Sequence, residues 1–143
     1  MPESIDVAIG ILTERRAGQW FVFITRRRDE SVLGGYWEMP GGKVARAESH
    51  RSCVAREFAE EVALEVEVGA SLPVIVHEYD HATVRLHPFF CTRRDGDPRD
   101  LEVDEHRWVC ADDLAGYRFP PANDTLIERV VRAIDGWEGA ADG

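Results

Sequence analysis

Cysteines, basic residues and long apolar segments are what this sequence of 143 residues has least of. Its three cysteines form no Cys-x-x-Cys pair, and their odd number argues against a framework of disulfide bonds. No apolar run approaches the ~20 residues that a membrane-spanning helix needs. The N-terminal segment also lacks the basic flank and apolar core of a signal peptide. We therefore expect a cytoplasmic protein that binds no membrane.

Basic residues are outnumbered, because 17 Lys and Arg against 27 Asp and Glu give a formal net charge of −10. This charge disfavours binding to a nucleic-acid polymer, whose backbone needs a basic surface. It does not exclude a nucleotide, since divalent cations can lie between protein carboxylates and a polyphosphate. The charge is equally compatible with a role in solubility alone, so composition leaves both interpretations open.

The length suits one domain, and the chain has no internal repeat or low-complexity linker. We expect a single domain over residues 1–137 and a frayed tail at 138–143. Strands interleaved with two helices favour an α/β fold with helices packed on a mixed sheet. Pro88 lies inside an expected strand and predicts an edge position or a bulge there. Apolar periodicity predicts strands at 5–12, 20–25, 65–68, 72–77, 83–92 and 106–110, and helices at 48–64 and 124–137.

The helix expected at 48–64 has an acidic face. Residues three and four apart share one side of an α-helix, so Glu57, Glu60 and Glu61 cluster there, beside an apolar stripe that can pack into a core. Such carboxylates repel one another by roughly 0.2–0.5 kcal/mol for each exposed pair. Mg²⁺ would relieve this repulsion, because it binds carboxylate and phosphate oxygens. Taken alone, however, this spacing is more often a solvated helix face.

The order of residues around the acidic face is far more specific than the acids alone. Gly42, five residues, Glu48 and seven residues precede Arg56-Glu57-Phe58-Ala59-Glu60-Glu61-Val62-Ala63-Leu64. This segment resembles the Nudix box, and eight of its nine specified positions agree. The family has glycine at the position of Ala63, so this alanine either adopts a left-handed conformation at a cost of ~1 kcal/mol or lets the helix continue. The resemblance implies the Nudix fold, an α/β/α sandwich with a mixed β-sheet flanked by helices.

The resemblance also implies a metal site for Mg²⁺ or Mn²⁺. Its ligands would be Glu57, Glu60, Glu61 and the carbonyl oxygen of Gly41. Glu57 would in addition orient or deprotonate the attacking water. Glu105 corresponds to a region where relatives place a further metal-binding or base carboxylate.

Other residues would support this metal site. Arg56 would orient the box acids through charge-assisted hydrogen bonds, with Glu48 as its structural partner. Arg27, Lys43 and Glu38 are candidates for substrate binding, with Arg27 and Lys43 near the phosphates. Arg27 is equally well explained as a solvated loop cation. Three histidines share no tight ligand spacing, and Mg²⁺ prefers oxygen, so we interpret them as strand and loop residues: His77, His81 and His87.

Two further segments resemble the MutT branch of the family, Trp37–Val44 and Phe119–Asp124. MutT-type enzymes hydrolyse oxidised purine nucleoside triphosphates, above all 8-oxo-dGTP, to the monophosphate and pyrophosphate. The Asn123 amide can accept a hydrogen bond from N7–H of 8-oxoguanine and donate one to O6, and ordinary guanine does not offer this pair. Asn123 can instead cap the last helix, and both roles can coexist.

The sequence therefore predicts Mg²⁺-dependent hydrolysis of a small-molecule nucleotide, with oxidised purine triphosphates as the favoured substrates. One alternative is a Nudix pyrophosphatase for another compound, such as CTP, a dinucleoside polyphosphate or a nucleotide sugar. Another is a non-catalytic Nudix-like module that binds nucleotides or regulates, but such modules have usually lost box acids that are all present here. Either a monomer or a homodimer fits the sequence.

Overall fold

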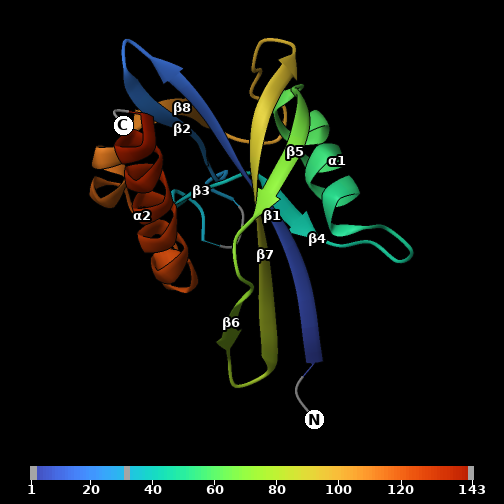
Figure 1. Ribbon diagram of the computed structural model, residues 1–143. Coiled ribbons are helices and arrows are strands. Elements are labelled where there is room, and N and C mark those ends of the chain that lie inside the picture. The colour runs from blue at the N-terminus through green and yellow to red at the C-terminus, as the bar shows by residue number, and fades with distance from the viewer. Residues whose placement is uncertain (1–2, 31–32, 142–143) are drawn as a thin grey trace.

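Two strands of 14 residues, β1 (Glu3–Arg16) and β7 (Ala82–Asp95), form the centre of this computed structural model, which describes residues 3–30 and 33–141. They pair in parallel from Glu3 opposite Ala82 to Leu12 opposite Cys91. The other strand pairings are antiparallel, so the sheet is mixed, as expected (Figure 1).

The remaining strands extend this centre on both sides. Ala17 and Gly18, both at positive φ, form the two-residue turn that joins β1 to β2. The order through the sheet is β3-β2-β1-β7-β5, and β4, β6 and β8 pair with β1, β7 and β2. All six expected strands are confirmed, whereas β3 and β4 are too short to show alternation in the sequence. The strands are β2 (Gln19–Arg26), β3 (Trp37–Glu38), β4 (Gly41–Lys43), β5 (Glu65–Ser71), β6 (Ile75–Glu78) and β8 (Glu105–Cys110).

One helix covers each face of the sheet. Successive residues of a strand point to opposite faces, so β1 contributes Ile9 and Ile11 to one core and Ala8 and Leu12 to the other. The first core lies under α2 (Asp124–Ala141) and the second under α1 (His50–Val62). Figure 1 shows the two helices on opposite sides of the strands. This arrangement confirms the α/β/α sandwich. Two 3₁₀ segments, Ala111–Gly116 and Pro121–Asn123, lead into α2.

The helix ends differ from expectation in ways that their caps explain. The first helix, α1, spans His50–Val62 and begins two residues later than predicted, because the Ser49 side chain caps it by accepting from the Ser52 N–H. Ala63 follows α1 with φ 58° and ψ 33°, so the left-handed alternative is correct. The second helix ends at Ala141, four residues beyond the predicted end at 137. Residues 142–143 lie outside the described residues.

Pro88 does not lie on an edge strand. Strand β7 has β1 on one side and β5 and β6 on the other, and Pro88 faces the junction between those two short strands. Its carbonyl accepts from the Leu72 N–H at 2.9 Å. The register of β5 shifts between Val68 and Ser71, close to this junction, so the irregularity predicted by proline is present without an edge.

Cys53 and Cys91 are buried, Cys110 is partly buried, and all three are free thiols. Within residues 3–30 and 33–141, no helix is long and apolar enough to span a bilayer.

Candidate active site

A glycine turn lies between the sheet and α1. The Pro40 carbonyl accepts from the Gly10 N–H at 2.8 Å, which anchors the turn on β1. A side chain at Gly41 would collide with the Ala8 backbone, and a Cβ at Gly42 would lie 2.5 Å from Glu57 Oε1. Glycine at both positions is therefore what allows this backbone to approach the strand and the acidic helix so closely.

Glu57 and Glu61 form the centre of the site. The Gly41 N–H donates to Glu61 Oε2 at 3.2 Å, and the Glu57 carboxylate is close enough to influence the pKa of Glu61. Burial raises the pKa of Glu61 to about 9, and the neighbouring charges of Glu38 and Glu57 act in the same direction. Burial also raises the pKa of Glu57. Two carboxylates this close repel each other when both are charged, so the pair is well placed to bind a cation that relieves this repulsion.

Glu38 and Glu60 flank this pair, and we call Glu38, Glu57, Glu60 and Glu61 the carboxylate cluster. Glu38, on β3, accepts from Arg27 Nη1 at 3.0 Å. Burial raises the pKa of Glu38, partly opposed by Arg27 and reinforced by Glu57. The Glu60 side chain is 47% exposed, against 15% for Glu57. The cluster thus extends from a buried interior to an open rim, which a polyphosphate can approach.

Arg56 connects the cluster to the loop before α1. Its guanidinium forms a two-point contact with Glu48, with Nε–Oε2 at 2.7 Å and Nη2–Oε1 at 3.1 Å. Nη1 donates to Glu57 Oε1 and Glu60 Oε2, each at 3.1 Å. The Arg56 hydrogen bond, with the Ala45 N–H second, lowers the pKa of Glu48 to about 2. Arg56 is one-third exposed, yet its contacts are those expected for a residue that orients the acids.

Glu105 is not brought to the cluster by any described contact. It lies opposite Arg26 on β2, and Arg26 lies opposite Trp37, whose side chain belongs to the core under α2. Directly opposed residues point to the same face, so Glu105 faces away from α1 and pairs with Arg26 and Arg107 instead. The structure thus places Glu105 away from the carboxylate cluster, on the opposite face of the sheet.

A further acid, Glu102, contacts the end of α1 from the loop before β8, and nothing in the sequence singles it out. Its N–H donates to the Glu61 carbonyl at 3.1 Å, as does the N–H of Leu101. These bonds hold the loop before β8 against the C-terminal end of α1. No sequence spacing points to this contact, because it depends on the path of an irregular loop.

Asn123 and Lys43 lie outside the cluster. Asn123 ends the 3₁₀ segment before α2, and its N–H donates to the Pro120 carbonyl at 2.8 Å. Its partly exposed amide has no hydrogen-bond partner in the described part of the chain, so it makes no capping bond there. Lys43 ends β4, and its carbonyl accepts from Arg56 Nη2 at 3.4 Å.

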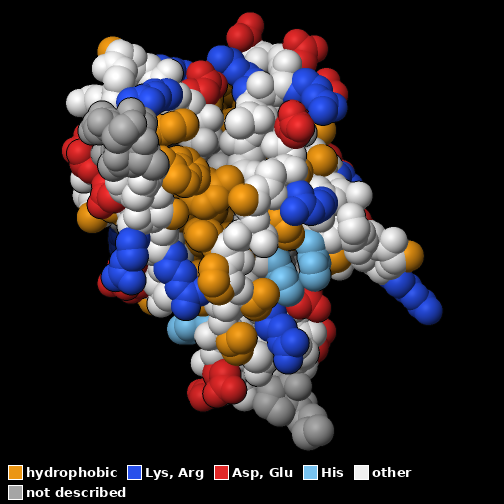
Figure 2. All heavy atoms as spheres, in the orientation of Figure 1, with side chains coloured by type: hydrophobic (Ala, Val, Ile, Leu, Met, Phe, Trp, Pro, Cys, Tyr) orange, Lys and Arg blue, Asp and Glu red, His pale blue; other side chains and the backbone are white. Residues whose placement is uncertain are grey.

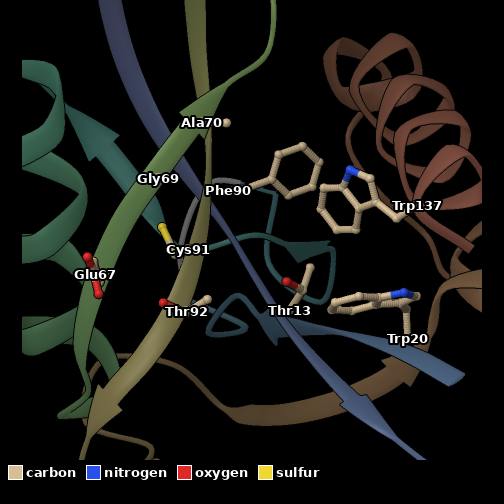
Figure 3. Close-up of a pocket in the computed structure, with 9 residues that line it drawn as sticks. All are labelled: Thr13, Trp20, Glu67, Gly69, Ala70, Phe90, Cys91, Thr92 and Trp137. Atoms are coloured by element: carbon tan, nitrogen blue, oxygen red, sulfur yellow. The ribbon is translucent and has the colours of Figure 1, made fainter. Parts of the chain in front are cut away.

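A cavity of about 510 Å³ lies apart from these residues, at the far end of α2 (Figure 3). Trp137 packs there against Trp20 and Phe90, with ring centroids 5.2 and 4.6 Å away. Its lining includes none of the carboxylate cluster. The cavity is therefore separate from the acidic site.

The sandwich, the glycine turn and the acidic helix together define a hydrolase of the class that acts on nucleotides and generally needs a divalent metal. Residues 8–129 match the family model of the NUDIX domain. The chain belongs to the Nudix family, and it is a Nudix hydrolase of the MutT-like kind.

Several similar proteins align with nearly the whole chain. The 8-oxo-dGTP diphosphatase of Escherichia coli K12 is 27% identical over 130 residues, which are 91% of this chain and 98% of that protein. The CTP pyrophosphohydrolase of the same organism is 29% identical over 129 residues, 88% of this chain and 90% of that one. A solved structure of MutT, from work on Aliivibrio salmonicida and Vibrio cholerae, is 33% identical with a TM-score of 0.71 and covers 92% of this chain and 99% of that chain.

Proposed function

We propose that this chain hydrolyses 8-oxo-dGTP and related oxidised purine nucleoside triphosphates to the monophosphate and pyrophosphate. The observation that carries the proposal is the crowding of the Glu57 and Glu61 carboxylates beside the glycine turn, in a chain similar to the 8-oxo-dGTP diphosphatase of E. coli. Carboxylates crowded together in a partly buried site repel one another, and a divalent cation relieves that repulsion.

The donor set fits Mg²⁺ or Mn²⁺, because it consists of oxygen atoms only. Glu57, Glu60 and Glu61 would hold the metal together with the Gly41 carbonyl, and Glu102 is positioned to join them from its loop. When bound, such a cation neutralises phosphate charge and makes water a better nucleophile. Cation binding would relieve the repulsion among these carboxylates. After burial, this repulsion is the next cause that raises the pKa of Glu61.

The residues around the cluster have separate tasks. Glu57 accepts the proton of the attacking water, and Arg56 holds Glu57 and Glu60 in place while Glu48 holds Arg56. Arg27, beside Glu38 at the edge of the cluster, binds phosphate oxygens, and Lys43 adds positive charge at the end of the glycine turn.

Base recognition falls to Asn123. Its amide is without a partner in the described residues and partly exposed, so it can accept from N7–H and donate to O6 of an oxidised purine. Ordinary guanine presents an acceptor at N7 and leaves the amide oxygen unpaired. The free amide favours this role over helix capping.

The test compares kcat/KM for 8-oxo-dGTP and dGTP with Mg²⁺, in the wild type and in Asn123→Ala. We expect the wild type to prefer the oxidised base at least ~100-fold, which corresponds to ~2.7 kcal/mol. Asn123→Ala should reduce this preference to about tenfold or less while hydrolysis of dGTP stays within a few-fold. Equal turnover of both nucleotides by the wild type would contradict the proposed specificity.

A second candidate substrate is CTP, and similarity to the E. coli CTP pyrophosphohydrolase favours it. CTP therefore belongs in the same assay. A kcat/KM for CTP above that for 8-oxo-dGTP would replace the first candidate by the second and leave the assignment of the carboxylate cluster intact.

A further inference from the structure

Three residues that are far apart in the sequence meet on the α1 face of the sheet. Asp6 lies on β1, His87 on β7, and His50 is the first residue of α1. One ligand atom from each lies within 4.8 Å of the other two. We propose that Asp6, His50 and His87 form a second metal site, which binds Zn²⁺ or a similar transition-metal cation independently of the carboxylate cluster.

The contacts within this trio bring two imidazoles and one carboxylate together. His87 Nε2 lies 2.8 Å from Asp6 Oδ1, and the His50 and His87 rings stack with centroids 3.9 Å apart. Figure 2 shows histidine side chains gathered at the surface, close to where α1 meets the strands. His87 is 14% exposed and Asp6 48%, so one side of the trio is supported by protein and the other is open to solvent.

The chemistry of the trio differs from that of the carboxylate cluster. Imidazole nitrogen suits Zn²⁺, Cu²⁺ and Ni²⁺, whereas Mg²⁺ prefers oxygen alone. Three protein ligands with a solvent-facing fourth position match zinc sites that keep an open coordination position. The Asp6 carboxylate, whose Oδ1 lies 2.8 Å from His87 Nε2, would supply the oxygen ligand.

The required movement is small. Tetrahedral bonds of about 2.0–2.1 Å place ligand atoms roughly 3.4 Å apart, so atoms within 4.8 Å must approach by little more than ~1 Å. Rotation of the His50 ring out of its stack would bring the ligand atoms closer together. The side chain has the freedom to rotate because it is only partly buried. The backbone around Asp6 is already fixed, since its carbonyl accepts from the Val44 N–H at 3.0 Å.

The trio is also separate from the acids of the box. His50 precedes Glu57 by seven residues and Glu61 by eleven, which places them ~10–17 Å apart along the helix axis. A cation at the trio would connect β1, β7 and the start of α1, the elements that support the glycine turn. The expected structural effect is a brace for the first turn of the acidic helix.

The test titrates Cu²⁺ and Co²⁺ into the metal-free protein with excess Mg²⁺ present to occupy oxygen ligands. We expect one equivalent of Cu²⁺ whose electron paramagnetic resonance spectrum shows hyperfine coupling to nitrogen, and one equivalent of Co²⁺ with the absorption of a nitrogen-containing site. Zn²⁺ should displace Co²⁺ and raise the unfolding temperature. These readouts need no nucleotide, so they succeed or fail independently of the proposed hydrolysis.

Matched variants locate the site. His50→Gln and His87→Gln should each weaken Zn²⁺ binding at least tenfold and reduce the nitrogen coupling. His77→Gln, which changes a histidine that packs against Tyr79, and Glu57→Gln should leave both unchanged. Unfolding temperatures within a few degrees of the wild type without metal confirm that the variants fold. The proposal is overturned if copper shows no nitrogen coupling, or if His50→Gln and His87→Gln bind Zn²⁺ as tightly as His77→Gln.

Discussion

The two helices pack on opposite faces of one sheet, and they are held there by different forces. Helix α2 presents Leu126, Ile127, Val130 and Ile134, all buried, to a large apolar core. Helix α1 also has an apolar stripe, but its other side carries buried acids and the Arg56 ion pairs. Burial of like charges is unfavourable unless something compensates it. Helix α2 therefore mainly contributes stability. We propose that α1 lowers stability through its buried charges because these charges serve the reaction.

The strongest way to sharpen this contrast is to neutralise one acid on α1. Glu57→Gln keeps the shape of the side chain but removes the proton acceptor and one charge for the metal, so we expect kcat to fall by ~10³-fold or more, on the scale of an essential acid–base group. Unfolding temperature should stay equal or rise. The measurement is Mg²⁺-dependent pyrophosphate release, with Glu65→Gln, an exposed acid on β5, as the control. Near-normal turnover would show that Glu57 is not at the reacting atoms.

The matching change on the other face is Ile134→Ala. Ile134 lies on α2 and is fully buried in the core between this helix and the sheet, so the loss of its side chain should lower the free energy of unfolding by ~2–5 kcal/mol. At a temperature where the variant remains folded, kcat should change less than about threefold. Denaturant unfolding and turnover on the same preparation check both values. A large loss of kcat with the fold intact would contradict the proposal that α2 contributes stability and α1 contributes the chemistry.

Glu61 tests the electrostatic cost directly. Its pKa is about 9 in the folded protein, above the ordinary glutamate value of 4.5, so between these pH values the folded state holds a proton that the unfolded state has lost. Stability without metal should therefore fall as the pH rises from 5 to 9, by more than about 1.4 kcal/mol, the equivalent of one pKa unit. Glu61→Gln should remove most of this fall. Thermal unfolding across the pH range measures it, and Glu65→Gln should behave as the wild type does; an unchanged pH dependence in Glu61→Gln would contradict the assignment.

The smallest expected effect is at the end of α1. Ala63 has φ 58°, a conformation that favours glycine, so Ala63→Gly should stabilise the protein by up to ~1 kcal/mol. Turnover should be unchanged, because Ala63 contributes no ligand. Denaturant unfolding is the measurement, and Ala59→Gly, inside the same helix, should instead destabilise by a similar amount. Destabilisation by Ala63→Gly would mean that the backbone strain lies elsewhere.

The parts of this structure that follow from local sequence were predictable. The fixed spacing of the box places Glu57, Glu60 and Glu61 on one helix face, and the alternation of β1 places its residues in two cores. The contact between Arg56 and Glu48 also follows, since both belong to the same motif. In each case the relation spans a few turns of one element or one fixed motif.

The parts that depend on long-range contacts were not predictable. Glu105 and Glu102 are three residues apart, and only the path of the loop decides which one is held against α1. His50 and His87 lie on different elements, and the parallel pairing of β1 with β7 is what brings His87 to Asp6. Pattern spacing carries no information about such meetings, because they are set by sheet topology.

The central proposal is that a divalent cation relieves the crowding of the carboxylate cluster and enables hydrolysis. The most direct test is pyrophosphate release from 8-oxo-dGTP by the wild type, first with a chelator and then after Mg²⁺ is added back in excess. We expect no pyrophosphate release above background with the chelator and full recovery of release with Mg²⁺. Release that continues at the same rate in the chelator would contradict it.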